Sequence, residues 1–282
     1  MVYLITGATG DVGSRVVELL IQMGERPRLF VRDLQKARSR FGDRVDILVG
    51  DLGDPESVRR ALRGVDKLFL VTTGPQIPVR DEIAASAAKS AGVKYLVKLS
   101  SMDVQHGLAI GAWHERGEAA VRASGVPFTF LQPTGFMSNL LAWASSVKSE
   151  AIVRSSTGDG RRAFIHSDDI AAVAVKSLTT AGYQGQPLPI TGPEALTFAE
   201  VTAKVSGAIG RPLTFQPISD EEARQRYSRV SGSEEETNAH VALWRAIREG
   251  RLARVTNDVE RVLGRKPISL DRWLTENIAT FQ

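Results

Sequence analysis

The chain has 282 residues, of which 43% are hydrophobic and 24% are charged, and its formal net charge is +4. This composition excludes disordered and fibrous proteins, and so small a net charge gives no support to a nucleic-acid partner. The absence of cysteine excludes disulfide scaffolds, thiol nucleophiles, iron–sulfur clusters and cysteine-bound zinc. No apolar run approaches the roughly 20 residues of a membrane-spanning helix, and the first motif begins at Thr6, so we expect a cytoplasmic protein without a signal peptide.

Short apolar segments alternate with helical patterns through the first two-thirds of the chain. We expect six strands, at residues 2–6, 28–31, 45–49, 67–71, 95–99 and 128–131. The helices between them are expected at residues 12–23, 34–40, from Pro55 onward, 83–91 and 115–123. Every connection is too long for a hairpin, so the predicted fold is α/β: a doubly wound Rossmann sheet of parallel strands with helices on both faces.

The alternation ends after about residue 133. Beyond that point, residues 158–160 and 187–193 are turn-rich segments. A helix is expected at residues 168–178 and a strand at residues 213–217. From Phe198 onward the chain is otherwise mostly helical, and the polar segment 231–236 is expected to be a mobile loop.

These patterns predict two parts of unequal size. Residues 1–133 form the nucleotide-binding core, to which helix 168–178 and a strand at 187–191 return. Residues 134–282 form mainly a smaller, mostly helical lobe for the substrate.

The first strand runs into the turn Thr6-Gly7-Ala8-Thr9-Gly10-Asp11-Val12-Gly13, whose glycines are spaced G-x-x-G-x-x-G. Between a strand and a helix at the start of a βαβ unit, this spacing is typical of a dinucleotide site, because the helix N-terminus offers free N–H groups to phosphates. A plain glycine-rich turn is the alternative. The predicted cofactor contacts are Gly7, Thr9, Gly10, Asp11, Val12 and Gly13.

The end of the second strand distinguishes NAD from NADP. An NAD site usually has an acidic residue there, whereas this strand ends in Val31-Arg32, and a planar guanidinium suits the 2′-phosphate of NADP. Asp33 is expected to cap the next helix. We therefore predict NADP(H) in preference to NAD(H), with Arg32 at the 2′-phosphate, and we interpret Arg38 and Arg40 as a solvated helix face.

Further contacts are expected at the carboxyl ends of the other strands, where ligands of such sheets bind. The candidates for cofactor contacts there are Asp51, Leu52, Thr72, Thr73, Gly74, Gln132 and Pro133. Phe136 and Asn139 are candidates for the acceptor pocket, although Phe136 could equally belong to the core. His166 with Asp168 and Asp169 has the composition of a metal cluster, but adjacent acids before a helix more often cap it, so no metal is expected.

Several further segments are distinctive as a set. They are Val31-Arg32-Asp33, Gly50-Asp51-Leu52, Ala91-Gly92-Val93-Lys94-Tyr95, His114-x-x-x-Glu118, Leu131-Gln132-Pro133 and His166-Ser167-Asp168-Asp169-Ile170-Ala171. Together with the glycine turn they resemble the NmrA-like branch of the atypical short-chain dehydrogenases/reductases, over nearly the whole chain. The resemblance implies an NAD(P)H cofactor. The branch includes quinone oxidoreductases, triphenylmethane- and azo-dye reductases, and non-catalytic nucleotide-sensing regulators.

Ordinary short-chain dehydrogenases pair a tyrosine with a lysine four residues later, and this lysine lowers the pKa of the phenol. None of the four tyrosines in this chain has such a lysine, and Trp113-His114 occupies the place of the tyrosine. Tyr95 and Lys98 lie in a predicted strand and are interpreted as structural.

The remaining candidates for polarising an acceptor are Ser100 and Ser101, after the fifth strand, and His114. A surface or helix-capping role for His114 is equally compatible with the sequence. Glu118, four residues later on the same helix face, could orient His114 or form an exposed helix pair.

The missing tyrosine–lysine pair favours acceptors whose reduction needs no strong acid. Reduction of a ketone leaves a localised alkoxide, whereas a quinone or a cationic dye spreads charge by conjugation, so proximity to the nicotinamide can supply most of the effect. We therefore expect an NAD(P)H-dependent reductase that transfers hydride directly to a quinone or another conjugated aromatic acceptor, without flavin.

Two alternatives stay open. One is a non-catalytic NADP(H) sensor that acts on a protein partner, and the other is a nucleotide-sugar epimerase or dehydratase, which the missing pair disfavours. No nucleic-acid or membrane partner is expected, and a homodimer is an expectation from family analogy alone.

Overall fold

The computed structural model describes all 282 residues and divides into two compact units. The first unit comprises Met1–Val104, Gly111–Pro133 and Ser167–Pro189. The second comprises Gln105–Ile110, Thr134–His166 and Ile190–Gln282. None of the helices combines the length and the apolar character that crossing a membrane requires.

A seven-stranded sheet forms the middle of the first unit, in the order β10-β6-β5-β4-β1-β2-β3. Its strands are β1 (Tyr3–Thr6), β2 (Arg28–Val31), β3 (Asp46–Val49), β4 (Lys67–Val71), β5 (Tyr95–Leu99), β6 (Phe128–Pro133) and β10 (Pro187–Ile190). The five pairings among β1 to β6 are all parallel. The predicted doubly wound Rossmann fold is thus confirmed, and its seventh strand, β10, is the strand expected at residues 187–191 to return to this core.

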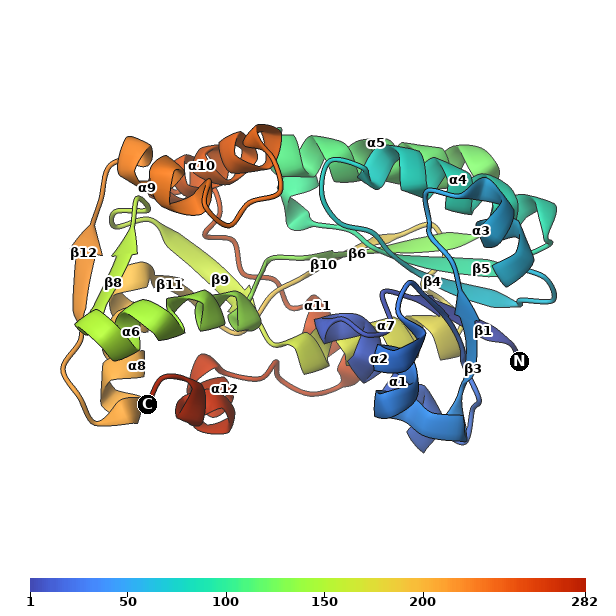
Figure 1. Cartoon of the computed structure of the whole chain (residues 1–282), viewed down its shortest axis with the longest axis horizontal. Coiled ribbons are helices and arrows are strands. Elements are labelled where there is room, and N and C mark those ends of the chain that lie inside the picture. The colour runs from blue at the N-terminus through green and yellow to red at the C-terminus, as the bar shows by residue number, and fades with distance from the viewer. The chain divides into compact units, whose positions relative to one another are not determined.

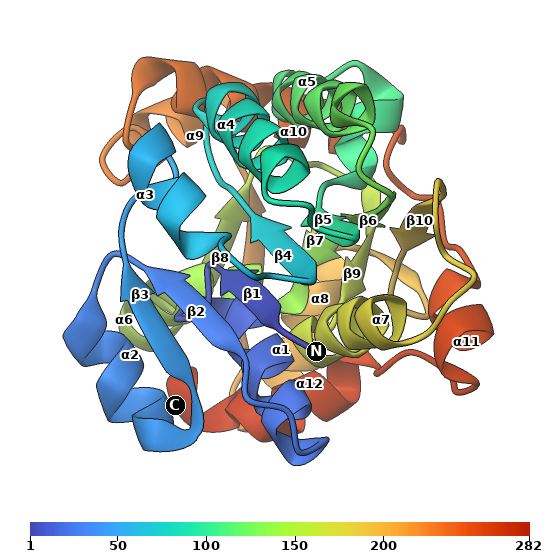
Figure 2. The same cartoon turned by 90° about the vertical axis from the view of Figure 1, so that its right-hand side faces the viewer.

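Helices cover both faces of this sheet (Figures 1 and 2). On one face lie α1 (Asp11–Gln22), α2 (Leu34–Phe41) and α7 (Ser167–Thr179), and on the other lie α3 (Pro55–Ala61), α4 (Ile77–Ser90) and α5 (Ala109–Ser124). The inner strands β1, β2, β4 and β5 are buried between these helices, which explains their largely apolar sequences, whereas β3 at the edge of the sheet is mostly exposed.

Two helices begin earlier than expected. Helix α4 begins at Ile77 rather than residue 83, because Pro78 lies in its first turn, where the missing N–H of proline is not needed. Helix α5 begins at Ala109 rather than residue 115, although Gly111 is a poor helix former. Glycine is required there because a Cβ at this position would lie 2.0 Å from the carbonyl oxygen of Asp103.

The switch point of the sheet lies between β1 and β4. From β1 the chain proceeds to β2 and β3 on one side, and then returns to β4, β5 and β6 on the other. The side chain of Thr6 joins the two strands: its hydroxyl lies 3.2 Å from the carbonyl oxygens of Phe69 and Val71 and accepts from the Val71 N–H at 2.7 Å. Ligands of such sheets bind at the carboxyl ends of the strands beside this point.

The second unit contains two small sheets, β7 (Gly135–Phe136), β9 (Arg161–Ile165) and β11 (Ala195–Thr197) in one, and β8 (Ile152–Ser155) and β12 (Thr214–Pro217) in the other. Its helices are α6 (Ala144–Glu150), α8 (Phe198–Ile209), α9 (Asp220–Tyr227), α10 (Glu234–Arg248), α11 (Asp258–Leu263) and α12 (Leu270–Asn277). Short 3₁₀ helices occur in the chain at Gly42–Arg44, Met102–His106, Met137–Trp143 and Ile278–Thr280. Of the five strands in the small sheets, only β12 was expected.

One apolar cluster holds the second unit together. Trp273 is buried in it, and Trp143 and Trp244 pack against it half-buried. The expectation of a mobile loop at residues 231–236 is wrong for its second half, since Glu234 begins α10 and Ser233 caps that helix by accepting from the N–H of Glu236 at 3.1 Å.

Candidate functional site

The turn between β1 and α1 brings backbone very close to backbone. Gly7 has a φ of +60°, which favours glycine, and a Cβ there would lie 2.9 Å from the side chain of Val71. A Cβ on Gly13 would lie 2.2 Å from the carbonyl oxygen of Gly7. Any larger residue at position 13 would therefore push the first turn of α1 away from the end of β1.

No side chain covers the N-terminus of α1. Its N-cap residue is Gly10, whose own N–H closes the turn by donating to the Gly7 carbonyl at 2.9 Å. The first-turn N–H groups of the helix are left without a capping side chain and carry a partial positive charge. This uncapped helix end fits the diphosphate of a dinucleotide, which accepts such hydrogen bonds. Gly7 and Gly10 are exposed, Thr9 is half-buried, and Val12 is buried in the core.

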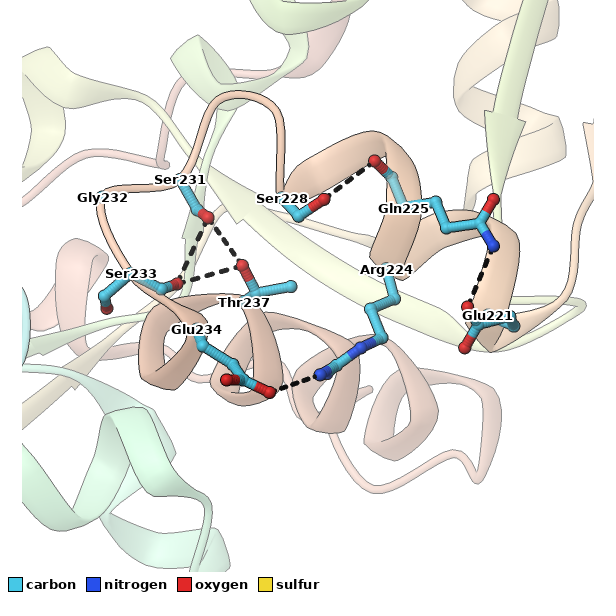
Figure 3. Close-up of a pocket in the computed structure, with 9 residues that line it drawn as sticks. All are labelled: Glu221, Arg224, Gln225, Ser228, Ser231, Gly232, Ser233, Glu234 and Thr237. Carbon is cyan, nitrogen blue, oxygen red and sulfur yellow. Dashed lines mark hydrogen bonds and ion pairs between the residues drawn. The ribbon is translucent and has the colours of Figure 1, made fainter.

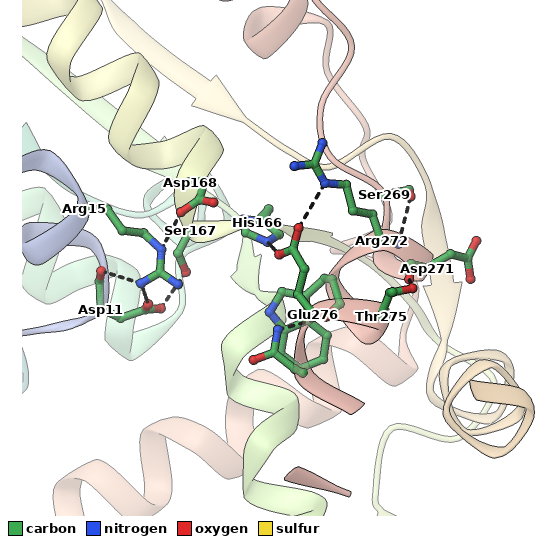
Figure 4. Close-up of polar contacts among 12 residues, drawn as sticks. Asp11, Arg15, His166, Ser167, Asp168, Ser269, Asp271, Arg272, Thr275 and Glu276 are labelled. Carbon is green, nitrogen blue, oxygen red and sulfur yellow. Dashed lines mark hydrogen bonds and ion pairs between the residues drawn. The ribbon is translucent and has the colours of Figure 1, made fainter. Parts of the chain in front are cut away.

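Asp11 brings a negative charge to the same turn, where an arginine and a serine hydroxyl bind its carboxylate (Figure 4). One carboxylate oxygen accepts from Arg15 at 2.5 Å, and the other accepts from the hydroxyl of Ser167, the first residue of α7, at 2.5 Å. Arg15 also pairs with Asp168 at 2.6 Å. The Asp11 side chain therefore joins α1 to α7, so its contact with a diphosphate would come from its backbone.

Arg32 follows β2 directly, as predicted, and its exposed side chain forms no hydrogen bond or ion pair within the chain. Neighbouring arginines are engaged: Arg26 pairs with Asp46 at 2.8 Å, and Arg28 donates to the carbonyl oxygens of Ala61 and Arg63. The predicted cap is confirmed, because the Asp33 carboxylate accepts from the N–H of Lys36 at 2.9 Å. Arg32 is thus available to a phosphate, whereas the neighbouring Asp33 is engaged in capping α2.

At the end of β3, the Asp51 carboxylate accepts from the N–H of Gly53 at 2.7 Å, and Leu52 is half-buried against the core. At the end of β4, the hydroxyl of Thr72 points into the protein and donates to Asp81 at 2.7 Å. Thr73 is exposed, and Gly74 is half-buried. Of the predicted residues after β4, Thr73 therefore offers a ligand an exposed side chain, and Gly74 offers its backbone.

A fully buried ion pair lies beneath this end of the sheet. Lys98 of β5 meets Asp81 of α4 at 2.5 Å, and neither side chain has any exposure. The Lys98 ammonium also lies 3.4 Å from the hydroxyl of Thr72. Gly117 of α5 makes room for the pair, since a Cβ there would lie 2.0 Å from a carboxylate oxygen of Asp81. The interpretation of Lys98 as structural agrees with this burial, but Asp81 was not anticipated.

Ser100 and Gln132 are joined by a third residue. Glu118 of α5 is 1% exposed, and one of its oxygens accepts from the Ser100 hydroxyl at 2.6 Å and from the Gln132 amide at 2.8 Å. Its other oxygen accepts from Arg122 at 3.1 Å. Both sequence interpretations of Glu118 are therefore wrong, because it is neither exposed nor bonded to His114. Pro133, next to Gln132, is buried at the end of β6.

His114 lies one helical turn before Glu118. Its Nδ1 atom is buried without a hydrogen-bond partner. Burial, and to a smaller extent the charge of Lys98, lower the pKa of His114 to about 3, so the imidazole is neutral at physiological pH. A surface or helix-capping role for His114 is not supported by these surroundings. The half-buried Ser101 accepts from the N–H of Asp103 at 3.1 Å, and its hydroxyl proton is not used within the chain.

The other predicted residues lie in the second unit. Phe136 of β7 is half-buried, and Asn139 is exposed in the following 3₁₀ helix. His166 contacts Glu276 at 3.1 Å (Figure 4). Asp168 and Asp169 belong to the first unit, where Asp168 pairs with Arg15 at 2.6 Å.

A hollow of about 370 Å³ in the second unit is lined by none of the predicted catalytic, cofactor-binding or acceptor-pocket residues (Figure 3). It lies between α9 and the start of α10 and is polar, with Arg224 reaching across to Glu234 at 2.8 Å. The hydroxyls of Ser231 and Thr237 are bonded to each other at 2.6 Å. The hydroxyl of Ser228 donates to the carbonyl oxygen of Gln225, and that of Ser233 accepts from the N–H of Glu236.

Sequence reasoning missed Asp81, Arg15, Gly117 and Arg122. A signal existed for the first, because Asp81 shares the spacing i, i+3, i+4 with Ala84 and Ala85 on the buried face of α4. A charged residue in phase with buried alanines predicts a buried partner of opposite charge.

The chain matches a family model described as NAD(P)H-binding over residues 7–181. It is 40% identical to a (4-alkanoyl-5-oxo-2,5-dihydrofuran-3-yl)methyl phosphate reductase of Streptomyces griseus, over 99% of this chain and 98% of the relative. It is 36% identical to an NAD(P)H azoreductase of Xenophilus azovorans, again over 99% and 98%.

Among solved structures, the chain is similar to the NADPH-dependent quinone oxidoreductase of Escherichia coli complexed with NADPH. The TM-score is 0.89 at 24% identity, and the match covers 98% of this chain and 99% of the other. At this level of identity the likeness shows a common fold. The family model and the two relatives show more: the chain belongs to the NAD(P)H-binding family and is a reductase.

Proposed function

We propose that this reductase transfers hydride from NADPH directly to a conjugated electrophilic acceptor, such as a quinone or a dye, without flavin and without a protein acid. The observation that carries the proposal is the state of the polar groups around the ends of β5 and β6. The Ser100 proton is committed to Glu118, His114 is a neutral imidazole, and no tyrosine–lysine pair is present.

The cofactor part of the proposal rests on the β1–α1 turn and on Arg32. The uncapped N-terminus of α1 would bind the diphosphate, and the unpartnered guanidinium of Arg32 would bind the 2′-phosphate, which favours NADP(H) over NAD(H). When bound, NADPH supplies a hydride from C4 of its nicotinamide ring. The residues around the ends of β5 and β6 would hold that ring and exclude water from it.

The acceptor class follows from what these residues cannot do. An aliphatic ketone would leave a localised alkoxide, which needs a proton donor whose pKa lies near the working pH. A His114 pKa of about 3 leaves almost no imidazolium at neutral pH. The hydroxyl of Ser101 can donate a hydrogen bond to a delocalised enolate or phenolate, but it is no stronger an acid than the alcohol that a ketone would give, so it provides no driving force for protonating an alkoxide.

The relatives support a conjugated acceptor. Their names describe an azoreductase, a quinone oxidoreductase and a reductase of an alkanoyl oxo-dihydrofuran, whose ring double bond is conjugated to carbonyl groups. These acceptors share an electrophilic π-system that spreads the incoming charge. This shared property, rather than any single substrate, is what we propose for the present chain.

The proposal is tested by the loss of NADPH absorbance with a panel of acceptors. A quinone, a triphenylmethane dye, an azo dye and an acyl dihydrofuranone should give turnover, with no gain from added flavin, and an aliphatic ketone of similar size should give none. Equal turnover of the ketone would contradict the proposal. No turnover with any acceptor, together with strong discrimination between NADP⁺ and NADPH in binding, would favour the redox sensor instead.

A further inference from the structure

A buried carboxylate joins the carboxyl ends of two neighbouring strands. Leu99 of β5 pairs with Leu131 of β6, so Ser100 and Gln132 follow side by side. Glu118 of α5 reaches both, at 2.6 Å to the hydroxyl of Ser100 and 2.8 Å to the amide nitrogen of Gln132. One oxygen atom of Glu118 accepts both bonds, so the two side chains are tied to a single point.

The carboxylate is itself held firmly. Its second oxygen accepts from Arg122 at 3.1 Å, one turn further along α5. The guanidinium of Arg122 lies 4.6 Å from the centre of the Phe130 ring, which fixes the cation from its other side. Three donors are therefore directed at Glu118, and its carboxylate accepts all three bonds.

The consequence is a fixed polarity for Ser100 and Gln132. A serine hydroxyl has one proton to donate, and Ser100 gives it to Glu118, so towards a ligand Ser100 can act only as a hydrogen-bond acceptor. The amide of Gln132 turns its nitrogen to Glu118, which places its oxygen on the opposite side of the amide. Without Glu118, the hydroxyl could rotate and the amide could flip.

These two residues lie on the half of the sheet that serves the nicotinamide. In a doubly wound sheet the half with β1 to β3 binds the adenosine, and the half with β4 to β6 binds the other nucleotide. The nicotinamide carries a carboxamide, whose N–H groups require acceptors.

We propose that Glu118 is a positioning residue for the nicotinamide half of the cofactor, where it holds the Gln132 amide in one orientation and keeps Ser100 an acceptor, so that Ser100 recognises the carboxamide by its N–H donors. The inference rests on the proposed NADPH site, but it is independent of the acceptor and of turnover.

The test compares two nucleotides in binding to the apo protein, with dissociation constants from titration calorimetry. NADPH contains the nicotinamide, whereas 2′,5′-ADP contains only the adenosine and its phosphates. In the Glu118→Gln variant the new amide brings a donor against the donors of Gln132 and Arg122, so one partner must turn. We expect NADPH to bind about tenfold more weakly, as for the loss of one oriented hydrogen bond, and 2′,5′-ADP to bind as to the wild type.

Two further variants complete the experiment. Glu115→Gln changes an exposed acid on the same helix and should leave both constants unchanged. Ser100→Ala removes one hydroxyl with little effect on folding and should weaken NADPH alone. In the Ser100→Ala background, Glu118→Gln should then weaken NADPH binding by a smaller factor than it does in the wild type, because the two residues act together.

The proposal is overturned if Glu118→Gln weakens both nucleotides equally, which would indicate a purely structural role, or if it weakens neither. If the Glu118→Gln variant does not fold, Ser100→Ala decides the question. An unchanged dissociation constant of NADPH in that variant also overturns the proposal. Failure of the proposed function would be seen separately, as absence of turnover in a wild type that still binds NADPH.

Discussion

Replacing Lys98 with methionine removes one half of an ion pair that has no access to water. The ammonium lies 2.5 Å from Asp81, and both side chains have 0% exposure. Methionine fills a similar volume, so the main effect is to leave the Asp81 carboxylate buried with the Thr72 hydroxyl as its remaining donor. Breaking a buried pair in this way costs about 3–5 kcal/mol of folding free energy.

The assay is equilibrium urea unfolding followed by circular dichroism, with a matched control and a double variant. Lys94→Met removes another lysine pair, with Asp66 at 2.7 Å, but the Lys94 side chain is 74% exposed, so its midpoint should hardly move. In Lys98→Met/Asp81→Asn the uncompensated charge is gone, and most of the lost stability should return. Asparagine suits the site because the space beside Gly117 admits nothing larger than the native carboxylate.

The reasoning is refuted if Lys98→Met costs no more than Lys94→Met. It is also refuted if the double variant is less stable than Lys98→Met, because the loss would then come from packing and not from an unpaired charge.

Three further changes test other parts of the site. Arg32→Glu should weaken NADPH about tenfold or more relative to NADH in a binding titration, since it replaces a charge-assisted contact by repulsion, and an unchanged ratio would contradict the 2′-phosphate assignment. Gly13→Ala forces a Cβ to within 2.2 Å of the Gly7 carbonyl and should abolish the thermal shift produced by NADPH, whereas Gly207→Ala, in α8 with open space around it, should preserve that shift. Because burial lowers the pKa of His114 from 6.5 to about 3, the unfolded chain binds a proton that the folded chain refuses, and wild-type stability should fall as the pH drops from 6.5 towards 3. His114→Gln should lose less stability over that interval, and an equal loss in both proteins would show that His114 is not desolvated.

The inner strands of the first unit are predictable because burial on both faces favours largely apolar sequences. The limits of β4 and β5 agree with the sequence prediction to the residue. The small strands of the second unit are not predictable in this way: β9 reads Arg-Arg-Ala-Phe-Ile and β8 reads Ile-Val-Arg-Ser, so neither length nor alternation distinguishes them from loop.

The sequence predicted which residues lie near the strand ends of the candidate site, but it did not predict the burial, the hydrogen-bond partners or the charge of each side chain. The glycine turn, Arg32 and the Asp33 cap follow from local rules that act over a few residues. Whether Glu118 is exposed or buried depends on how α5 is rotated against β5 and β6, which is decided by contacts distant in sequence. The neutral His114 has the same origin, since its pKa reflects burial and a lysine on another element.

The central claim, direct hydride transfer from NADPH to a conjugated acceptor, is tested most directly by isotope transfer. A triphenylmethane dye is the suitable acceptor, because hydride added to its central carbon gives a C–H bond that does not exchange with water. With NADPH deuterated at C4 on the transferred face, the account predicts one deuterium on the central carbon of the reduced dye, and none when unlabelled NADPH is used in heavy water. Reduced dye that carries solvent hydrogen instead would contradict direct transfer.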